Sequence, residues 1–203
     1  MFAYCNNCPV LFEDQSGNAL SHTTVAIKDA TGCYYIDNQE DCFYSNSGFG
    51  DSTIASSGCG LIAVYNILLS RGSDATFMDV YNAAFEFKAL ANNGEDGMYL
   101  EATINMLEHL DNISSKTILK KNNQSILILY GYYDCKVKRH GGHYVAGIDR
   151  GGGEYTFYND PFTPNNSMGL SDYLGILSEI TLVDQFNYKK FRIKIDYIYS
   201  VGG

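Results

Sequence analysis

The spacing of hydrophobic residues changes near residue 115 of the chain. Before this point apolar residues recur three and four positions apart, which is typical of helices with one buried face. We expect helices over 59–70, 77–90 and 100–110. In the first of them, one face collects these apolar residues: Leu61, Val64, Tyr65 and Leu68.

After residue 115 the pattern favours short antiparallel strands. Segments rich in β-branched and aromatic residues are bounded there by Asn, Gly or Asp, which is the usual setting of a strand. The three glycines at 151–153 predict a hairpin turn, and one further helix is expected over 170–179. The expected strands are 117–119, 125–130, 143–149, 155–158 and 191–199.

The first part of the chain carries weaker signals. Two β-prone segments, 23–27 and 33–36, flank turn residues and predict a hairpin. The Ser-, Gly- and Asn-rich stretch 37–58 predicts a long ordered loop, and such loops in compact domains usually carry function.

Helices first and antiparallel strands second are typical of an α+β protein. We therefore expect a single domain over 1–203, with a helical half at 37–115 and an antiparallel sheet half at 116–203. A chain of 203 residues, 45% hydrophobic and 18% charged, suits one domain with a buried core. No stretch approaches the roughly 18–20 apolar residues of a membrane-spanning helix. We expect no membrane partner and a cytoplasmic protein as given, or a secreted one if a signal peptide was removed.

Charge narrows the range of partners. The chain has 23 acidic and 14 basic residues and a net charge of −9, which is the wrong sign for a nucleic-acid binder. Residues 1–115 hold 3 basic and 15 acidic residues, whereas 116–203 hold 11 and 8. The acidic first half would attract a cationic substrate, or it is simply a solvated surface; charge alone leaves both interpretations open.

The clearest candidate for chemistry is Cys59, which stands in SSGCG where a Ser/Gly loop enters an apolar helix. A thiol at a helix N-terminus lies at the positive end of the helix dipole, which favours the thiolate. A buried structural cysteine is the alternative interpretation. If the functional interpretation holds, Cys59 is the chemically distinct member of the six cysteines.

A nucleophilic cysteine needs a base, and His143 is the best placed of the four histidines. It begins an expected strand, and Gly142 and Gly147 leave space around the imidazole. The hairpin at 151–153 returns the chain so that Asn159 and Asp160 lie alongside His143, where an amide or a carboxylate would orient the ring.

Together these segments resemble the C39-like branch of the papain-fold cysteine peptidases. The resemblance rests on blocks that follow the family's order: QED at 39–41, FGDSTIASSGCG at 49–60, GHYV at 142–145 and NDP at 159–161. It implies a papain-like fold and the hydrolysis of peptide bonds. It also implies a peptide or protein substrate, with no cofactor and no metal.

Carried over position by position, the resemblance makes Cys59 the nucleophile and His143 the general base. Asp160, or its neighbour Asn159, would orient the imidazole. Gln39 would donate the side-chain hydrogen bond of the oxyanion hole, where negative charge develops in the transition state.

Some positions leave room for other assignments. Asn46 stands nearer to Cys59 in the sequence than Gln39 does, and is the alternative donor. Leu61 stands where the family most often has proline, and the chain has no Trp, so Tyr44 would fill the space of the usual tryptophan.

Three other functions stay open. The same triad would serve acyl or peptidyl transfer, because both reactions pass through the same acyl-enzyme. Cys5 and Cys8 form a C-x-x-C pair and, with His140 and His143, would supply four zinc ligands. A non-catalytic interaction domain on the same fold is the third.

Overall fold

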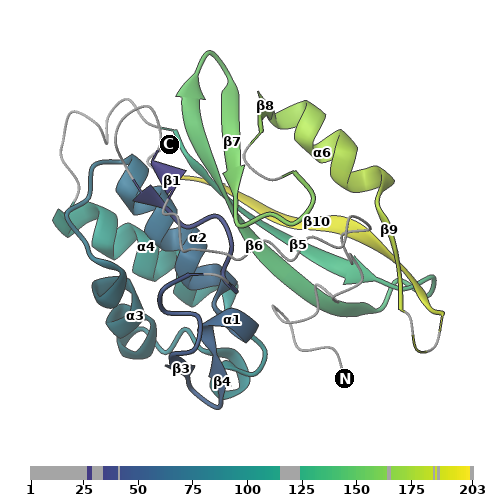
Figure 1. Cartoon of the computed structure of the whole chain (residues 1–203), viewed down its shortest axis with the longest axis horizontal. Coiled ribbons are helices and arrows are strands. Elements are labelled where there is room, and N and C mark those ends of the chain that lie inside the picture. Colours follow the sequence, from purple (N-terminus) through teal and green to yellow (C-terminus); the bar gives the residue numbers. More distant parts are fainter. Residues whose placement is uncertain are drawn as a thin grey trace.

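The computed structural model describes residues 27–28, 34–40, 42–114, 124–163, 166–184, 186 and 188–201. Over these residues helices dominate the first half of the chain and antiparallel strands the second, as the hydrophobic pattern predicts (Figure 1). The helices are α1 (Ile54–Ser57), α2 (Cys59–Ser70), α3 (Phe77–Glu86), the 3₁₀ turn η1 (Ala91–Gly94), α4 (Leu100–Ser114) and α6 (Leu170–Glu179). The strands are β1 (Ile27–Lys28), β2 (Tyr34–Tyr35), β3 (Gly48–Phe49), β4 (Ser52–Thr53), β5 (Ile126–Tyr133), β6 (Arg139–Gly151), β7 (Glu154–Tyr158), β8 (Ser167–Gly169), β9 (Thr181–Val183) and β10 (Lys190–Ser200).

A six-stranded sheet in the order β8-β7-β6-β5-β10-β9 forms most of the second half. Every neighbouring pair in it is antiparallel. The predicted hairpin between β6 and β7 is present, and Gly151, Gly152 and Gly153 all have positive φ, which glycine adopts without strain. The prediction of a single α+β domain is confirmed, and its sheet is curled.

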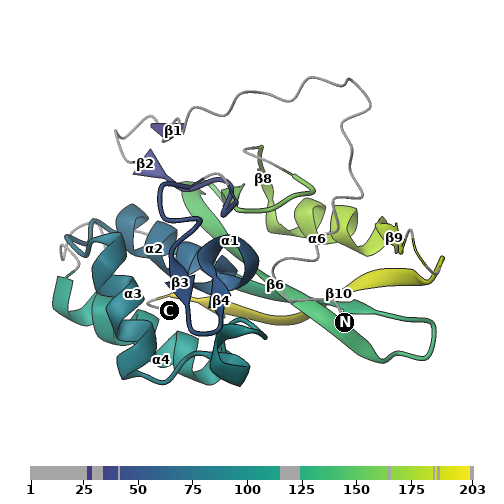
Figure 2. The same ribbon diagram turned by 60° about the horizontal axis from the view of Figure 1, so that its bottom comes forward.

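Different helices cover the two faces of the sheet (Figures 1 and 2). On one face α2, with α3 and α4 beside it, packs against Tyr144 and Ala146 of β6. On the other face α6 packs against the sheet, and Tyr173 stacks on Phe157 with 3.6 Å between ring centroids. Because successive side chains of a strand point to opposite faces, Val145 belongs to the α6 core although both its neighbours face α2.

Helix α2 is the central helix of the domain. From Cys59 to Leu68 every residue except Tyr65 is buried, so the expectation of a single apolar face is too narrow. The side chain of Asn66 bonds both the N–H and the carbonyl of Ile36, which holds segment 34–40 against the helix. For all its apolar character α2 has only 12 residues, and no helix of the described residues meets the length and hydropathy that a bilayer crossing requires.

Several boundaries differ from the expected ones. The stretch expected to be a loop over 37–58 contains the small β3–β4 hairpin and α1. Helix α3 ends at Glu86 and not at residue 90, because Lys88 adopts a φ of 53°, outside the helical region. The pattern does not predict β8 and β9, which have three residues each, and the expected strand 117–119 lies outside the described residues.

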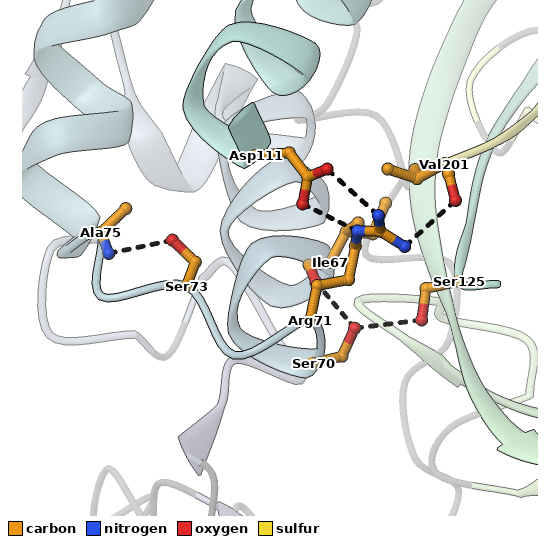
Figure 3. A network of polar contacts seen from close by, with 8 residues as sticks. All are labelled: Ile67, Ser70, Arg71, Ser73, Ala75, Asp111, Ser125 and Val201. Carbon is orange, nitrogen blue, oxygen red and sulfur yellow. Dashed lines mark hydrogen bonds and ion pairs between the residues drawn. The ribbon is translucent and has the colours of Figure 1, made fainter. Parts of the chain in front are cut away.

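A buried ion pair joins the end of α2 to two other elements (Figure 3). Arg71, the C-cap of α2, donates from Nε and Nη2 to the two carboxylate oxygens of Asp111 in α4, at 2.8 and 3.1 Å. Its Nη1 donates to the carbonyl of Val201, just beyond β10, at 3.1 Å. The hydroxyls of Ser70 and Ser125 are hydrogen-bonded next to it. One polar cluster thus ties α2 to α4 and to the sheet.

Replacing Arg71 by Met should lower the free energy of unfolding by about 3–5 kcal/mol, because it leaves the buried carboxylate of Asp111 without its guanidinium. Removing both charges, with Asp111→Leu added, should cost less than Arg71→Met alone. Urea unfolding followed by circular dichroism measures both. The matched control is Arg192→Met on the surface, expected to change the value by less than about 0.5 kcal/mol. An Arg71 variant as stable as this control would refute the role of the cluster.

Candidate active site

Cys59 begins helix α2 and is almost inaccessible, with 1% of its surface exposed. Helix α1 precedes it and is capped by Thr53, whose hydroxyl oxygen accepts a hydrogen bond from the Ser56 N–H at 3.2 Å. Gly58 ends α1 and caps α2 at a single kink. The chain therefore starts a new helix at Cys59, which places this residue at the positive end of the α2 dipole.

A cavity of about 420 Å³ lies between the helical half and the sheet, and Cys59 lines it. The loop between η1 and α4, with Met98, forms the helical wall, and Gly142 and Tyr144 of β6 contribute to the sheet wall. The Tyr144 hydroxyl donates to the Met98 carbonyl at 3.1 Å, so the two walls are joined. Burial raises the pKa of Tyr144 to about 12, which keeps this hydroxyl a neutral donor.

The sulfur of Cys59 is engaged in a disulfide bond. The other cysteine of this bond lies outside the described residues, whereas Cys135, exposed in the turn after β5, is free. The sequence predicts a reactive thiol at residue 59. The structure instead holds this sulfur in its oxidised form, which cannot act as a nucleophile until the bond is reduced.

His143 lies in β6 between the cavity-lining Gly142 and Tyr144, and its ring packs beside Tyr130 with 5.6 Å between centroids. Its Nε2 is 2.5 Å from the carbonyl oxygen of Asn159. A carbonyl only accepts, so Nε2 carries the proton and the lone pair of the neutral ring is at Nδ1. Burial lowers the pKa of His143 below 6.5, and the Asn159 hydrogen bond and a nearby carboxylate charge raise it by less.

The two candidates for orienting His143 act differently. Asn159 follows β7 with a φ of 57°, a left-handed conformation that Asn adopts more readily than most residues, and this turn brings its carbonyl to the imidazole. Asp160 is buried, and its carboxylate accepts from Thr163 Oγ1 at 2.5 Å and from the Tyr130 hydroxyl at 3.3 Å. Asn159 thus contacts the ring, while Asp160 acts on it through its charge.

Gln39 is buried between Asn159 and helix α1. Its backbone N–H donates to Asn159 Oδ1 at 2.9 Å, and its Oε1 accepts from Asn159 Nδ2 at 3.1 Å. Its Nε2 donates to the carbonyl of Ala55 at 2.6 Å, whereas the alternative amide, Asn46, lies exposed at the surface. A hydrogen-bonded chain therefore runs from His143 through Asn159 and Gln39 to α1, the helix directly before Cys59.

The described residues of the zinc alternative have other partners. The Nε2 of His140 lies 2.9 Å from a carboxylate oxygen of Asp134, and His143 is bonded to a backbone carbonyl. Cys5 and Cys8 lie outside the described residues. Within the part of the chain that the structure describes, no group of three or more His, Cys, Asp or Glu is arranged to hold a metal ion.

The sequence analysis missed an ion pair that lines the cavity. Arg139 Nε donates to Asp196 Oδ2 at 2.8 Å, and both residues line the same cavity as Cys59. Asp196 stands in a bulge of β10, where the register shifts between Ile195 and Tyr197. The signal was present, because the apolar positions of the alternating pattern change phase after Ile195.

Comparisons with known protein families, with curated proteins and with solved structures find no match for this chain. The functional argument therefore rests on the residues and geometry of this site.

In the folded protein His143 should titrate below pH 6.5, because burial disfavours the charged ring. Asp160→Asn should lower its pKa further, since the Asp160 charge raises it. The ¹H–¹³C NMR signal of the ring Cε1–H against pH measures both values. The unfolded chain binds this proton more readily, so His143 should also lower the protein's stability as pH drops below 6.5.

A matched control for this titration is Glu86→Gln, which removes an exposed carboxylate from α3. It should leave the His143 titration unchanged. A His143 pKa above 6.5 in the folded protein, or an equal shift in both variants, would rule out this account of the ring's environment.

Proposed function

We propose that the protein is a cysteine peptidase with a papain-like fold, which hydrolyses peptide bonds by means of Cys59, His143 and Gln39. The observation that supports this best is the position of Cys59. It is the first residue of α2 and lines the cavity together with Gly142 and Tyr144, the two neighbours of His143 in β6. A peptide in this cavity would meet the Cys59 sulfur on the helical wall and β6, the strand that carries His143, on the sheet wall.

In the reduced site, His143 is the proposed acceptor of the Cys59 proton. Because the two side chains lie on opposite faces of β6, the proton has to pass around this strand as the sulfur attacks the carbonyl carbon of the substrate. The bond from Nε2 to Asn159 favours this direction, because it keeps the lone pair at Nδ1. The tetrahedral intermediate collapses, the amine leaves with the proton from His143, and a thioester remains. Water then gives a proton to Nδ1, hydrolyses the thioester and restores the thiol.

Gln39 is suited to stabilise the oxyanion of both intermediates. Its side chain is held at both ends, by Asn159 and by the carbonyl of Ala55. An amide NH₂ group carries two N–H donors, so a bond to Ala55 and a bond to an oxyanion are compatible. One preorganised donor of this kind contributes about 3–4 kcal/mol in the transition state. Asp160 supports the imidazolium that forms during the reaction, since its charge favours the protonated ring.

The disulfide at Cys59 makes reduction a precondition of this activity. A dithiol reductant attacks the bond, is oxidised to its own disulfide and leaves Cys59 as a thiol. The oxidised protein would then be a latent form of the proposed peptidase.

After reduction with dithiothreitol, a peptidyl chloromethyl ketone should label Cys59, and the oxidised protein should not be labelled there, because only the thiol is nucleophilic. Mass spectrometry of the digested protein identifies the modified residue. Exposed Cys135 is the internal control, since iodoacetamide should modify it before and after reduction alike. A reduced, folded protein that reacts with the ketone at Cys135 alone would disprove the nucleophile assignment.

On a mixed peptide library, reduced Cys59→Ala should show no hydrolysis above background, whereas Cys135→Ala should retain the activity of the unmodified chain. Gln39→Ala should lower kcat by about 10²–10³-fold with a smaller effect on KM, because the oxyanion exists only beyond the ground state. Mass spectrometry of the products and steady-state kinetics measure these effects. Full activity in Cys59→Ala would end the peptidase proposal.

A further inference from the structure

Strand β10 carries a row of basic side chains next to the site. Lys190, Arg192 and Lys194 are exposed and alternate with the buried Phe191 and Ile193. Because the two apolar residues pack toward α6, the three cations lie on the opposite face of the sheet. The ends of β5, β6 and β10 extend beyond the helical half, so the helices leave this part of the face uncovered (Figure 2).

The basic row is continuous with the cavity that contains Cys59. Lys194 pairs across the strands with Gly131 of β5, and its Nζ lies 5.1 Å from the ring centre of Tyr133. The Tyr133 hydroxyl donates to Asp196 at 2.5 Å, and Asp196 lines the cavity together with Cys59. A bound peptide that extends out of the cavity along the sheet therefore passes over these residues.

Two glycines keep the surface between the row and the cavity low. A Cβ atom at Gly142 would lie 2.2 Å from Arg139 Nη2, and one at Gly131 would lie 2.7 Å from Asp196 Oδ2. Arg139 and Asp196 therefore lie flat across the strands, and the Asp196 charge is balanced by the guanidinium. Lys190, Arg192 and Lys194 are exposed charges that an approaching ligand meets on this face.

We propose that Lys190, Arg192 and Lys194 bind an acidic stretch of the peptide whose scissile bond lies in the cavity, which rests on the peptidase function proposed above. The three cations span about 13 Å, the length of about four residues of an extended peptide. The cavity's helical wall carries Asp96, so the acidic stretch flanks the scissile bond and does not contain it. The net charge of −9 disfavours a long polyanion, whereas a short acidic stretch responds to local charge.

The test uses fluorescein-labelled peptides with one neutral core and a flanking tract of about four residues made of Glu, Gln or Lys, placed at either end. Fluorescence anisotropy with the reduced full-length Cys59→Ala chain measures Kd without turnover. In one orientation the Glu peptide should bind about tenfold more tightly than the Gln peptide, and the Lys peptide least tightly. This preference should shrink between about 0.05 and about 0.5 M NaCl.

Neutralising the row, with Lys190→Gln, Arg192→Gln and Lys194→Gln together, should remove most of the preference for the Glu peptide. Lys88→Gln, an exposed change in the helical half, is the control and should not alter it. If the triple variant does not fold, two measurements take its place. One is the peptide preference of Arg192→Gln alone, and the other is the salt dependence of binding by the chain with all three cations intact. Equal binding of the Glu and Gln peptides overturns the proposal, and so does a preference that survives neutralisation.

Two further results separate this proposal from its alternatives. Selective binding of the Glu peptide by a chain that cleaves no peptide after reduction supports the acidic-ligand surface and refutes the peptidase function. Binding to phosphatidylserine vesicles or salt-sensitive self-association, each lost on neutralising the row and each without peptide preference, assigns the surface to another occupant and overturns the proposal.

Discussion

The burial of helix α2 on almost every side is the constraint on which the rest of the structure depends. An enclosed helix must find partners for every polar group that it buries, and α2 buries Asn66 in its middle, Cys59 at its start and Arg71 at its end. A buried guanidinium is tolerated only with matched acceptors, which Asp111 and the Val201 carbonyl supply. By tying the end of α2 to α4 and the sheet, these bonds also fix where Cys59 lies.

The alternation of strand β6 then divides the candidate site between two faces. Tyr144 faces the cavity with Cys59, whereas His143, one residue earlier, packs beside Tyr130. The connection between the two sides runs around the strand through Asn159 and Gln39. Segment 34–40 is therefore part of the site's framework, because it is bonded both to α2 and to the residue that follows β7.

The pattern of the sequence predicts the elements whose stability is local. The bounds of α2 and α6 agree with their expected ranges, and the β6–β7 hairpin follows from its three glycines. Strands β8 and β9 escape prediction because three residues acquire strand structure only by pairing with a neighbour. At the site, local motifs indicate Gln39, Cys59 and His143. The contact of His143 with a backbone carbonyl depends on one left-handed residue, Asn159, and the disulfide at Cys59 depends on a second cysteine. No local pattern encodes either.

In the proposed peptidase, the burial of Cys59 and His143 determines at which point of the reaction the proton moves from the thiol to the imidazole. A resting thiolate–imidazolium pair would place two charges where Cys59 is 1% and His143 is 5% exposed. A helix N-terminus stabilises an anion by about 0.3–1 kcal/mol, which is less than the several kcal/mol that burying each ion costs. Burial also lowers the pKa of His143, which favours the neutral ring. The proton then moves only as the sulfur attacks, when the new negative charge lies on the substrate oxygen and Gln39 can stabilise it.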